Sequence, residues 1–188
     1  MPQPIEDNRS DQELVAAINA GDGDAFEAIY WRHRDWAAAL AQRFTGDSAM
    51  VPDIVQEAFL YLLGKFPGFA LTSQLRTFLY PAVRNLSLNA RRKLIRLQPT
   101  DHEQLDQHEA PAASTAQPSD GRKDELLAVL QGLPEEHRET LWLRFVDGLS
   151  LAEVAETLDV PVGTVKSRLH NAVRMLREDP RTKNFFGP

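Results

Sequence analysis

The sequence of 188 residues contains no cysteine, which excludes disulfide bonds and thiolate zinc sites and favours a reducing, intracellular setting. It also contains no apolar run that approaches the ~18 residues of a membrane-spanning helix. The polar, acidic start from Met1 to Asp11 has neither the basic beginning nor the apolar core of a signal peptide. These absences predict a cytoplasmic protein without membrane insertion.

The motifs that often mark an enzyme are missing as well. There is no GxxxxGK phosphate loop, no HExxH metal pair, no cysteine nucleophile and no GxSxG serine turn. We therefore expect no catalytic residue, no metal and no cofactor. Metal ligation is conceivable only in one polar tract, where solvated side chains are the favoured interpretation of His102, Glu103, Asp106 and His108.

The charge of the chain is unevenly distributed. Its net value of −6 argues mildly against nucleic-acid binding when taken alone. Two stretches nevertheless carry bases and no acid: residues 84–96 hold five basic side chains and residues 166–177 hold four. Such stretches suit surfaces that face phosphate. From charge alone, two ordinary solvated helix faces explain the pattern equally well.

Apolar residues recur at helical spacing and no long stretch alternates like a strand, so the expected fold class is all-α. One of the expected helices runs from about Leu75 to Leu97. Residues 98–123 are rich in Pro, Ser, Thr and Gln and poor in large apolar side chains, which predicts a flexible acidic linker. It would separate two small helical domains, residues 1–97 and 124–188.

The second domain begins with a predicted helix that Pro134 starts and Gly148 ends. Proline lacks only an N–H that would be unpaired at a helix start, and glycine accepts the positive φ of a helix end. The spacing within the helix predicts a core face of Leu141, Trp142 and Phe145.

Two further helices are predicted to follow, joined by a tight turn. Ser150 and Glu153 have the spacing of a capping box at the start of the first, Ala155 is small where the two helices would cross, and Pro161 predicts the start of the second. The outward face of the second helix would carry side chains that hydrogen-bond base edges and phosphates: Thr164, Lys166, Ser167, Arg168, His170, Asn171 and Arg174. This is the pattern of a DNA-reading helix-turn-helix, and a plain helical hairpin is the alternative.

Residues 133–138 (LPEEHR), 145–150 (FVDGLS) and 161–169 (PVGTVKSRL) resemble the fourth region of sigma factors of the extracytoplasmic-function (ECF) group. The resemblance implies that the second helix reads the minus-thirty-five promoter element. Base edges would be contacted by some of Lys166, Ser167, Arg168 and Asn171, and the remaining candidates would contact phosphates.

Residues 53–59 (DIVQEAF) resemble the segment with which these sigma factors dock on a coiled coil of the largest polymerase subunits. Asp53, Gln56 and Glu57 fall at i, i+3 and i+4 and therefore share a helix face that can pair with Arg on a partner helix. Without the resemblance, a simply solvated face is favoured. The implied partners are core RNA polymerase (beta-prime coiled coil and beta flap), promoter DNA and an anti-sigma factor.

Residues 75–86 (LRTFLYPAVRNL) resemble the element that melts and reads the minus-ten promoter sequence. Bases stack on aromatic rings for ~1–3 kcal/mol each while basic side chains follow the phosphates. The candidate contacts are Arg76, Phe78, Tyr80, Arg84, Asn85, Asn89, Arg91 and Arg92. The loop of residues 70–74 would lie where the family captures a flipped base. Pro81 departs from the family pattern and should kink the helix, because it removes the bond to the Thr77 carbonyl.

The predicted function is therefore that of a sigma factor, which binds core RNA polymerase and directs transcription initiation at specific promoters. The resemblance covers residues 11–97 and 124–178. Two alternatives stay open from the sequence. One is a helix-turn-helix regulator with an unrelated N-terminal domain, and the other is a sigma-like interaction protein that has lost promoter melting.

Overall fold

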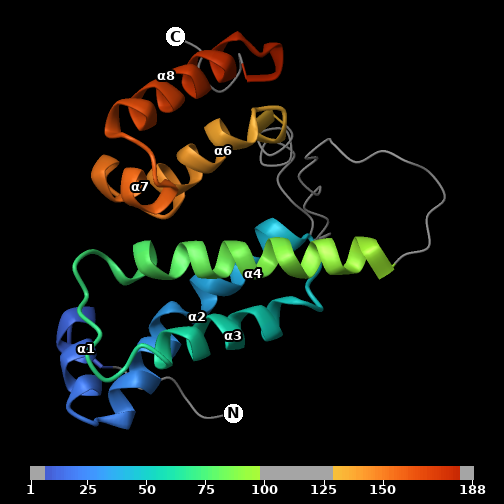
Figure 1. Ribbon diagram of the computed structural model, residues 1–188. Coiled ribbons are helices and arrows are strands. Elements are labelled where there is room, and N and C mark those ends of the chain that lie inside the picture. The colour runs from blue at the N-terminus through green and yellow to red at the C-terminus, as the bar shows by residue number, and fades with distance from the viewer. Residues whose placement is uncertain (1–6, 98–128, 183–188) are drawn as a thin grey trace. The chain divides into compact units, whose positions relative to one another are not determined.

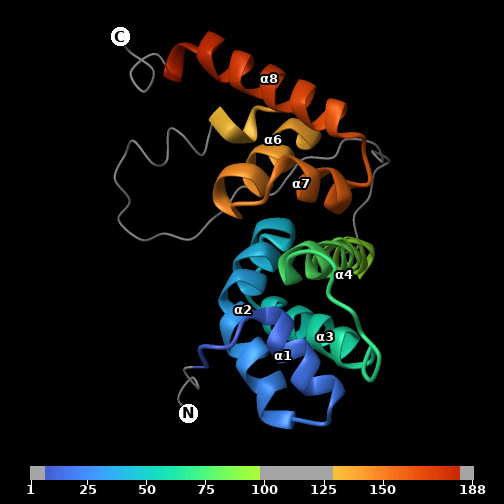
Figure 2. The same ribbon diagram turned by 90° about the vertical axis from the view of Figure 1, so that its left-hand side faces the viewer.

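The computed structural model describes residues 7–97 and 129–182. The chain divides into two compact units, residues 1–111 and 112–188, each of which is described below by itself. Every regular element of the described ranges is helical, which confirms the all-α prediction (Figures 1 and 2). None of these helices is long and apolar enough to cross a bilayer. The predicted linker, 98–123, lies outside the described residues, as do His102, Glu103, Asp106 and His108.

The first unit consists of α1 (Asp11–Asn19), α2 (Gly23–Thr45), α3 (Val51–Leu63) and α4 (Leu75–Leu97). The long helix α2 packs against the other three, and α3 also packs on α4 (Figure 1). Much of the buried face of α2 is alanine, which allows close approach of its neighbours: Ala25, Ala28, Ala37 and Ala41 are all buried. Large apolar side chains of the neighbouring helices fill the core, among them Leu14, Leu62, Leu79 and Val83.

Ion pairs tie the start of the chain to α2. The Asp11 carboxylate accepts a hydrogen bond from Arg32 (2.7 Å) and lies 2.8 Å from Nε2 of the buried His33. Burial of Asp11 opposes its ionisation and is the largest single effect on it. The bonds and charges of His33 and Arg32 together outweigh burial and lower the pKa of Asp11. Asp11 is therefore held as a carboxylate at neutral pH.

Helix α4 matches the predicted range and is continuous through Pro81. The proline still removes one N–H from the hydrogen-bond ladder of the helix. The buried hydroxyl of Thr77, one turn earlier, has no hydrogen-bond partner either. Pro81 thus does not end the helix, and a kink there stays a prediction.

The second unit contains α6 (Glu135–Leu141), a π-helical turn η1 (Trp142–Val146), α7 (Leu151–Leu158), α8 (Val162–Glu178) and the short 3-10 turn η2 (Pro180–Thr182). Helix α8 packs on both α6 and α7 (Figure 2). The core joins Leu133 and Leu141 to Ala172 and Leu176 of α8.

The predicted core face of the first helix of this unit is partly wrong. Leu141 is buried, but Phe145 is 68% exposed and Val146 is 61% exposed, while Leu143 and Leu149 are fully buried. The reason is the π-helical turn, in which the Asp147 N–H donates to the carbonyl of Trp142, five residues earlier. The prediction assumed α-helical spacing, and the wider turn rotates the later residues away from that face.

The predicted helix ends in this unit are confirmed at Gly148, Ser150 and Pro161. Gly148 has a φ of +75°. Ser150 caps α7 by accepting from the Glu153 N–H (3.2 Å), and Glu153 accepts from the Ser150 N–H in return (2.8 Å). Helix α8 begins directly after Pro161. Pro134, however, precedes the first residue of α6 rather than being that residue.

The capping box predicts a measurable loss of stability when its hydroxyl is removed. We expect Ser150→Ala to lower the free energy of unfolding by about 1 kcal/mol, because the Glu153 N–H loses its acceptor. Urea denaturation of the full chain measures this. Ser150→Asp is the matched control, since it retains an acceptor oxygen and should stay within about 0.5 kcal/mol of the original. Equal losses in both variants would contradict the capping role.

Candidate nucleic-acid interface

Helix α8 presents a polar and basic stripe on the side opposite its buried residues. Val165, Ala172 and Leu176 are buried against the rest of the unit, which fixes the rotation of the helix. The candidates that this rotation leaves exposed are Lys166, Ser167, His170 and Arg174. Lys166, His170 and Arg174 follow one another at four-residue steps, so they form one continuous row along the helix.

The remaining candidates on α8 are less accessible. Thr164 and Asn171 are half-buried at the edge of the stripe. Arg168 is turned toward α6, where its guanidinium lies 2.7 Å from the Glu136 carboxylate, and its side chain is only 20% exposed. An arginine with a carboxylate partner at this distance is held between two helices. In this geometry Arg168 ties α8 to α6 rather than reaching outward from α8.

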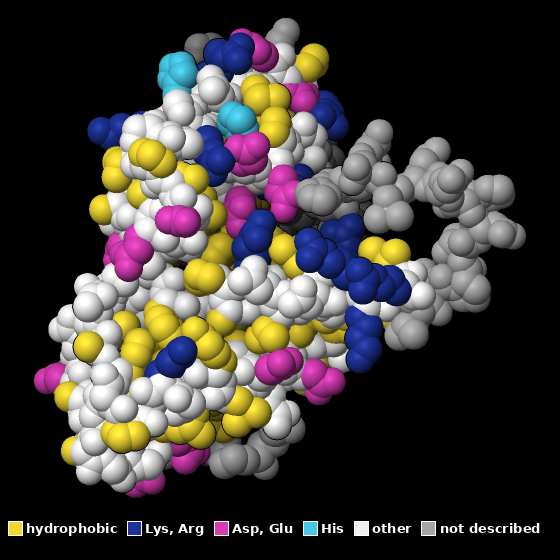
Figure 3. Space-filling view, viewed as in Figure 1, with side chains coloured by type: hydrophobic (Ala, Val, Ile, Leu, Met, Phe, Trp, Pro, Cys, Tyr) yellow, Lys and Arg dark blue, Asp and Glu magenta, His cyan; other side chains and the backbone are white. Residues whose placement is uncertain are grey.

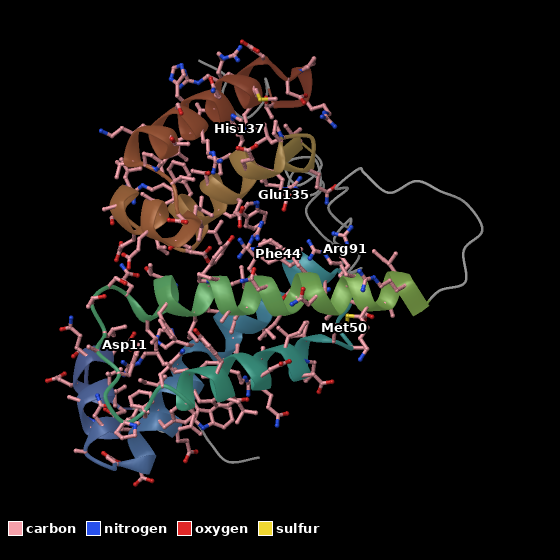
Figure 4. The ribbon with its side chains drawn as sticks, in the orientation of Figure 1. Asp11, Phe44, Met50, Arg91, Glu135 and His137 are labelled. Carbon is pink, nitrogen blue, oxygen red and sulfur yellow. The ribbon has the colours of Figure 1, made fainter. Side chains whose placement is uncertain are left out.

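Helix α4 carries the second group of candidates, and the structure places them in two settings. Asn85, Asn89 and Arg92 are exposed and lie at four- and three-residue steps, so they share one face. Lys and Arg side chains gather over the C-terminal half of this helix (Figure 3), where Arg92, Lys93 and Arg96 are exposed. Figure 4 shows Arg91 on the same half of α4.

Two arginines of α4 lie over aromatic rings of α2. The Arg76 guanidinium is 5.5 Å from the centre of the Trp36 ring, and that of Arg84 is 5.6 Å from the Phe44 ring. Phe44 itself lies beside the middle of α4 (Figure 4). Cation–π contacts of this kind hold a guanidinium in place without cancelling its charge. Both arginines are therefore positioned before any ligand arrives.

Tyr80 corrects the sequence prediction. Its side chain is only 1% exposed, and its ring packs edge-on against Phe44 with 6.2 Å between ring centres. A base cannot stack on a ring that the core encloses on all sides. Tyr80 follows the buried Leu79 on the inward face of α4, so its role is packing. Its burial rules out the base-stacking role that the sequence motif predicted.

Phe78 lies in a different setting, because it is half-buried at the start of α4 among other aromatic rings. Its ring is stacked on Tyr61 (5.8 Å, 12° between planes) and tilted against Phe69 (4.7 Å). Phe69 in turn packs edge-on against Phe66 (5.5 Å). This aromatic cluster joins the end of α3, the loop after it and the first turn of α4.

The three docking candidates on α3 are all exposed. Asp53, Gln56 and Glu57 lie opposite the buried Ile54, Val55, Ala58 and Phe59. Two exposed side chains that the sequence analysis did not predict extend this row of docking candidates. They are Leu60 and Tyr61, which lie at i+3 and i+4 from Glu57 and are 56% and 47% exposed. The helical spacing from Glu57 was the signal that could have identified them. Exposed Phe145 and Val146 in the second unit were also missed, because the π-helical turn left no such signal.

Among the described residues, no group of three or more His, Asp or Glu side chains is arranged to hold a metal ion. The candidate side chains on α4 and α8 instead offer basic groups, amides, hydroxyls and an aromatic ring. These groups suit hydrogen bonding to bases, attraction to phosphates and base stacking.

Comparisons with known proteins agree with this geometry. Residues 29–96 match the family model described as Sigma-70 region 2, and residues 123–176 match Sigma-70, region 4. The chain is 30% identical over 180 residues to the ECF RNA polymerase sigma factor SigW of Bacillus subtilis, with 90% of this chain and 96% of that protein covered. It is 32% identical over 178 residues to the ECF RNA polymerase sigma-E factor of Escherichia coli K12, with 89% and 93% covered.

Solved structures show the same fold. CnrH in complex with the cytosolic domain of CnrY gives a TM-score of 0.59 at 24% identity, with 88% of this chain and 93% of that chain covered. The sigma factor RpoE of Bartonella quintana, in complex with the anti-sigma factor NepR, gives 0.58 at 23% identity, with 81% and 94% covered.

The contact between Arg168 and Glu136 generates a test of how α8 is held. We expect a double-mutant cycle with Arg168→Ala and Glu136→Ala to give a coupling energy of about 0.5–1 kcal/mol in urea denaturation, because one partner is largely shielded from solvent. The more exposed pair Arg174 and Glu178, at 3.2 Å on the same helix, is the control. Its coupling should be about 0.3–0.5 kcal/mol. A coupling of zero for Arg168 and Glu136 would show that this contact does not fix α8.

Proposed function

The chain belongs to the ECF group of the sigma-70 family, and we propose from this premise how its surfaces divide the work of promoter recognition. It is a sigma factor that binds core RNA polymerase and directs initiation at specific promoters. The observation that carries this function is the presence of both sigma regions in one chain that matches known ECF sigma factors along nearly their whole length. A helix-turn-helix regulator would need the second region alone.

We assign the minus-thirty-five element to residues 124–188, with α8 in the major groove. Lys166, Ser167 and His170 occupy the N-terminal half of the exposed row and are the proposed contacts to base edges, with Arg174 toward phosphate. Thr164 and Asn171 border the row and complete the set. Arg168 supports the helix through Glu136 and would meet DNA only at its margin.

The minus-ten element is assigned to residues 1–97. Asn85 and Asn89 are exposed on α4 and Phe78 is half-buried on the same face at its start, and these three residues are the proposed contacts to unpaired bases. The basic groups that would follow the phosphates are Arg76, Arg84, Arg91 and Arg92. Tyr80 is left out because it is enclosed in the core. Residues 70–74, which connect the aromatic cluster to α4, are the proposed receptor for a flipped base.

Two surfaces are proposed for core polymerase. On α3, Asp53, Gln56 and Glu57 would pair with basic groups of the beta-prime coiled coil, and the exposed Leu60 and Tyr61 would add apolar contact. On the second unit, the exposed Phe145 and Val146 offer an apolar contact for the beta flap. Polymerase supplies the chemistry, and this chain supplies recognition without a catalytic group, metal or cofactor of its own.

An anti-sigma factor is the third proposed partner. CnrH and the Bartonella quintana RpoE were both solved in complex with a second protein, and the latter partner is named an anti-sigma factor. The exposed apolar side chains of α3 and η1 would have to be covered in the inactive state, and a partner that covers them would block polymerase. Residues 98–123, as a linker, would allow both units to engage one partner. The protein would act where core polymerase works, in the cytoplasm.

Promoter-dependent transcription tests this function. Purified chain added to core RNA polymerase should produce run-off transcripts from promoters of its host that core alone does not transcribe. Tight binding to duplex DNA without polymerase would instead support a simple regulator. Holoenzyme assembly without any transcript would support an interaction protein that has lost melting.

The α3 stripe gives a prediction for assembly with polymerase. We expect Gln56→Ala with Glu57→Ala to weaken binding to core polymerase by about 10- to 100-fold, since the charged contact of Glu57 alone is worth ~1.5–3 kcal/mol. Competition for core against the unmodified chain measures it. Gln12→Ala with Asp24→Ala likewise removes one amide and one carboxylate from exposed sites on α1 and α2 and is the matched control. Undiminished competition by the α3 variant would overturn the docking assignment.

The α8 row gives a prediction for DNA. We expect Lys166→Ala to weaken holoenzyme binding to promoter DNA, and to reduce the slope of log affinity against log salt by about 1 if its ammonium contacts a phosphate. If it reads a base instead, sequence preference within the minus-thirty-five element should relax, with a loss of about 1–3 kcal/mol. Arg34→Ala removes one positive charge from α2, where the guanidinium lies 3.0 Å from the Asp35 carboxylate, and should change neither. An unchanged affinity, salt slope and preference for Lys166→Ala would remove this residue from the interface.

A further inference from the structure

We propose that Asn19, at the end of α1, is a positioning residue that holds the α3–α4 loop in the shape required to capture a flipped base. This inference rests on the proposed role of residues 70–74. The Asn19 side-chain amide donates to the Phe69 carbonyl (2.8 Å), and its oxygen accepts from the Gly68 N–H (2.6 Å). One amide thus binds two successive backbone groups about fifty residues further along the chain, directly before the loop segment. Figure 1 shows the loop running past α1.

The position of Asn19 is itself fixed by the turn that follows it. The Gly21 N–H donates to the Ile18 carbonyl (2.9 Å) and the Asp22 N–H to the Ala17 carbonyl (3.0 Å). These two bonds form a Schellman motif, which needs the positive φ of Gly21, +95°. Asp22 then caps α2 through the Ala25 N–H (3.2 Å) and pairs with Arg9 (3.0 Å). The last turn of α1 therefore presents the Asn19 amide from a rigid base.

The loop is held from other directions as well. The Phe69 ring packs on Phe78 and Phe66, so the residue whose carbonyl Asn19 binds is also fixed through its side chain. At the other end, the Gln74 carbonyl accepts from the N–H groups of Thr77 (3.0 Å) and Phe78 (3.4 Å) in the first turn of α4. Residues 70–73 are left as a short span between two anchored ends, and Ala70 and Thr72 are exposed on it.

Such an arrangement suits capture of an unpaired base. A receptor loop that is ordered in advance loses less conformational entropy on binding, so more of the contact energy appears as affinity and discrimination. Only a side-chain amide offers a donor and an acceptor side by side for a carbonyl and an N–H. Aspartate at this position would keep the acceptor for Gly68 but face the Phe69 carbonyl with an oxygen. Asn19 touches no base itself and acts through the loop.

An abasic scan of the minus-ten strand tests this role. Holoenzyme is bound to single-stranded oligonucleotides with the nontemplate minus-ten sequence of a promoter that it transcribes, and each base in turn is replaced by an abasic site. For the original protein we expect base removal to lower affinity at the positions contacted by α4 and also, by about 5- to 100-fold, at the position captured by residues 70–74. For Asn19→Ala the loss at this position should shrink to about 3-fold or less, since an unanchored loop no longer discriminates.

Further variants distinguish a positioning role of Asn19 from a general loss of folding or DNA binding. Asn19→Asp keeps one of the two hydrogen bonds and should also lose discrimination, while Gln12→Ala, at an exposed site on the same helix, should retain it fully. Thermal unfolding establishes that each variant is folded. Full discrimination in both Asn19 variants, or an equal loss of affinity for every oligonucleotide, would overturn the proposal. If no position matters even for the original protein, the proposed function of the loop itself fails.

Discussion

The burial of one face of each helix is the constraint on which every proposed surface depends. In α8, Val165, Ala172 and Leu176 are buried, and the row that begins with Lys166 is what remains. In α3, the buried Ile54, Val55, Ala58, Phe59 and Leu62 leave the stripe from Asp53 to Tyr61 outside. Because an α-helix repeats every 3.6 residues, fixing one face also fixes which side chains can meet a partner. Apolar packing therefore sets the geometry of recognition.

Within those surfaces, many charged groups are already held by intramolecular contacts. Arg168 is paired with Glu136, and Arg76 and Arg84 lie over Trp36 and Phe44. These contacts keep long side chains in fixed positions, so less side-chain entropy is lost when a ligand binds. They also distinguish basic residues that support a helix from basic residues that are exposed, which the sequence alone does not distinguish. Arg168 and Lys166 are neighbours in one motif, yet Arg168 is paired with Glu136 of another helix, whereas Lys166 is exposed.

The same separation applies to aromatic residues. Phe78 and Tyr80 are two residues apart in the segment typical of promoter melting, but Tyr80 is enclosed in the core and Phe78 is half-buried between Tyr61 and Phe69 in the aromatic cluster. That cluster links α3, the following loop and α4, while Asn19 binds the loop from α1. The proposed base receptor is thus built from two parts of the chain that are distant in sequence, Asn19 and residues 61–78. Its shape depends on packing and hydrogen bonds that no local motif contains.

The sequence by itself determined the helical fold, the range of α4, the capping box at Ser150 and the start of α8, because these follow from local spacing and backbone chemistry. Its motifs also identified the family. The tertiary structure decided what depends on helix register and on distant contacts. Phe145, in the π-helical turn, is exposed where the sequence predicted burial, and Tyr80 is buried where the sequence predicted a contact with DNA. Arg168 pairs with Glu136 of α6, and Asn19 of α1 binds the Phe69 carbonyl. Local spacing cannot report these features, since each arises from groups that meet only after the helices pack.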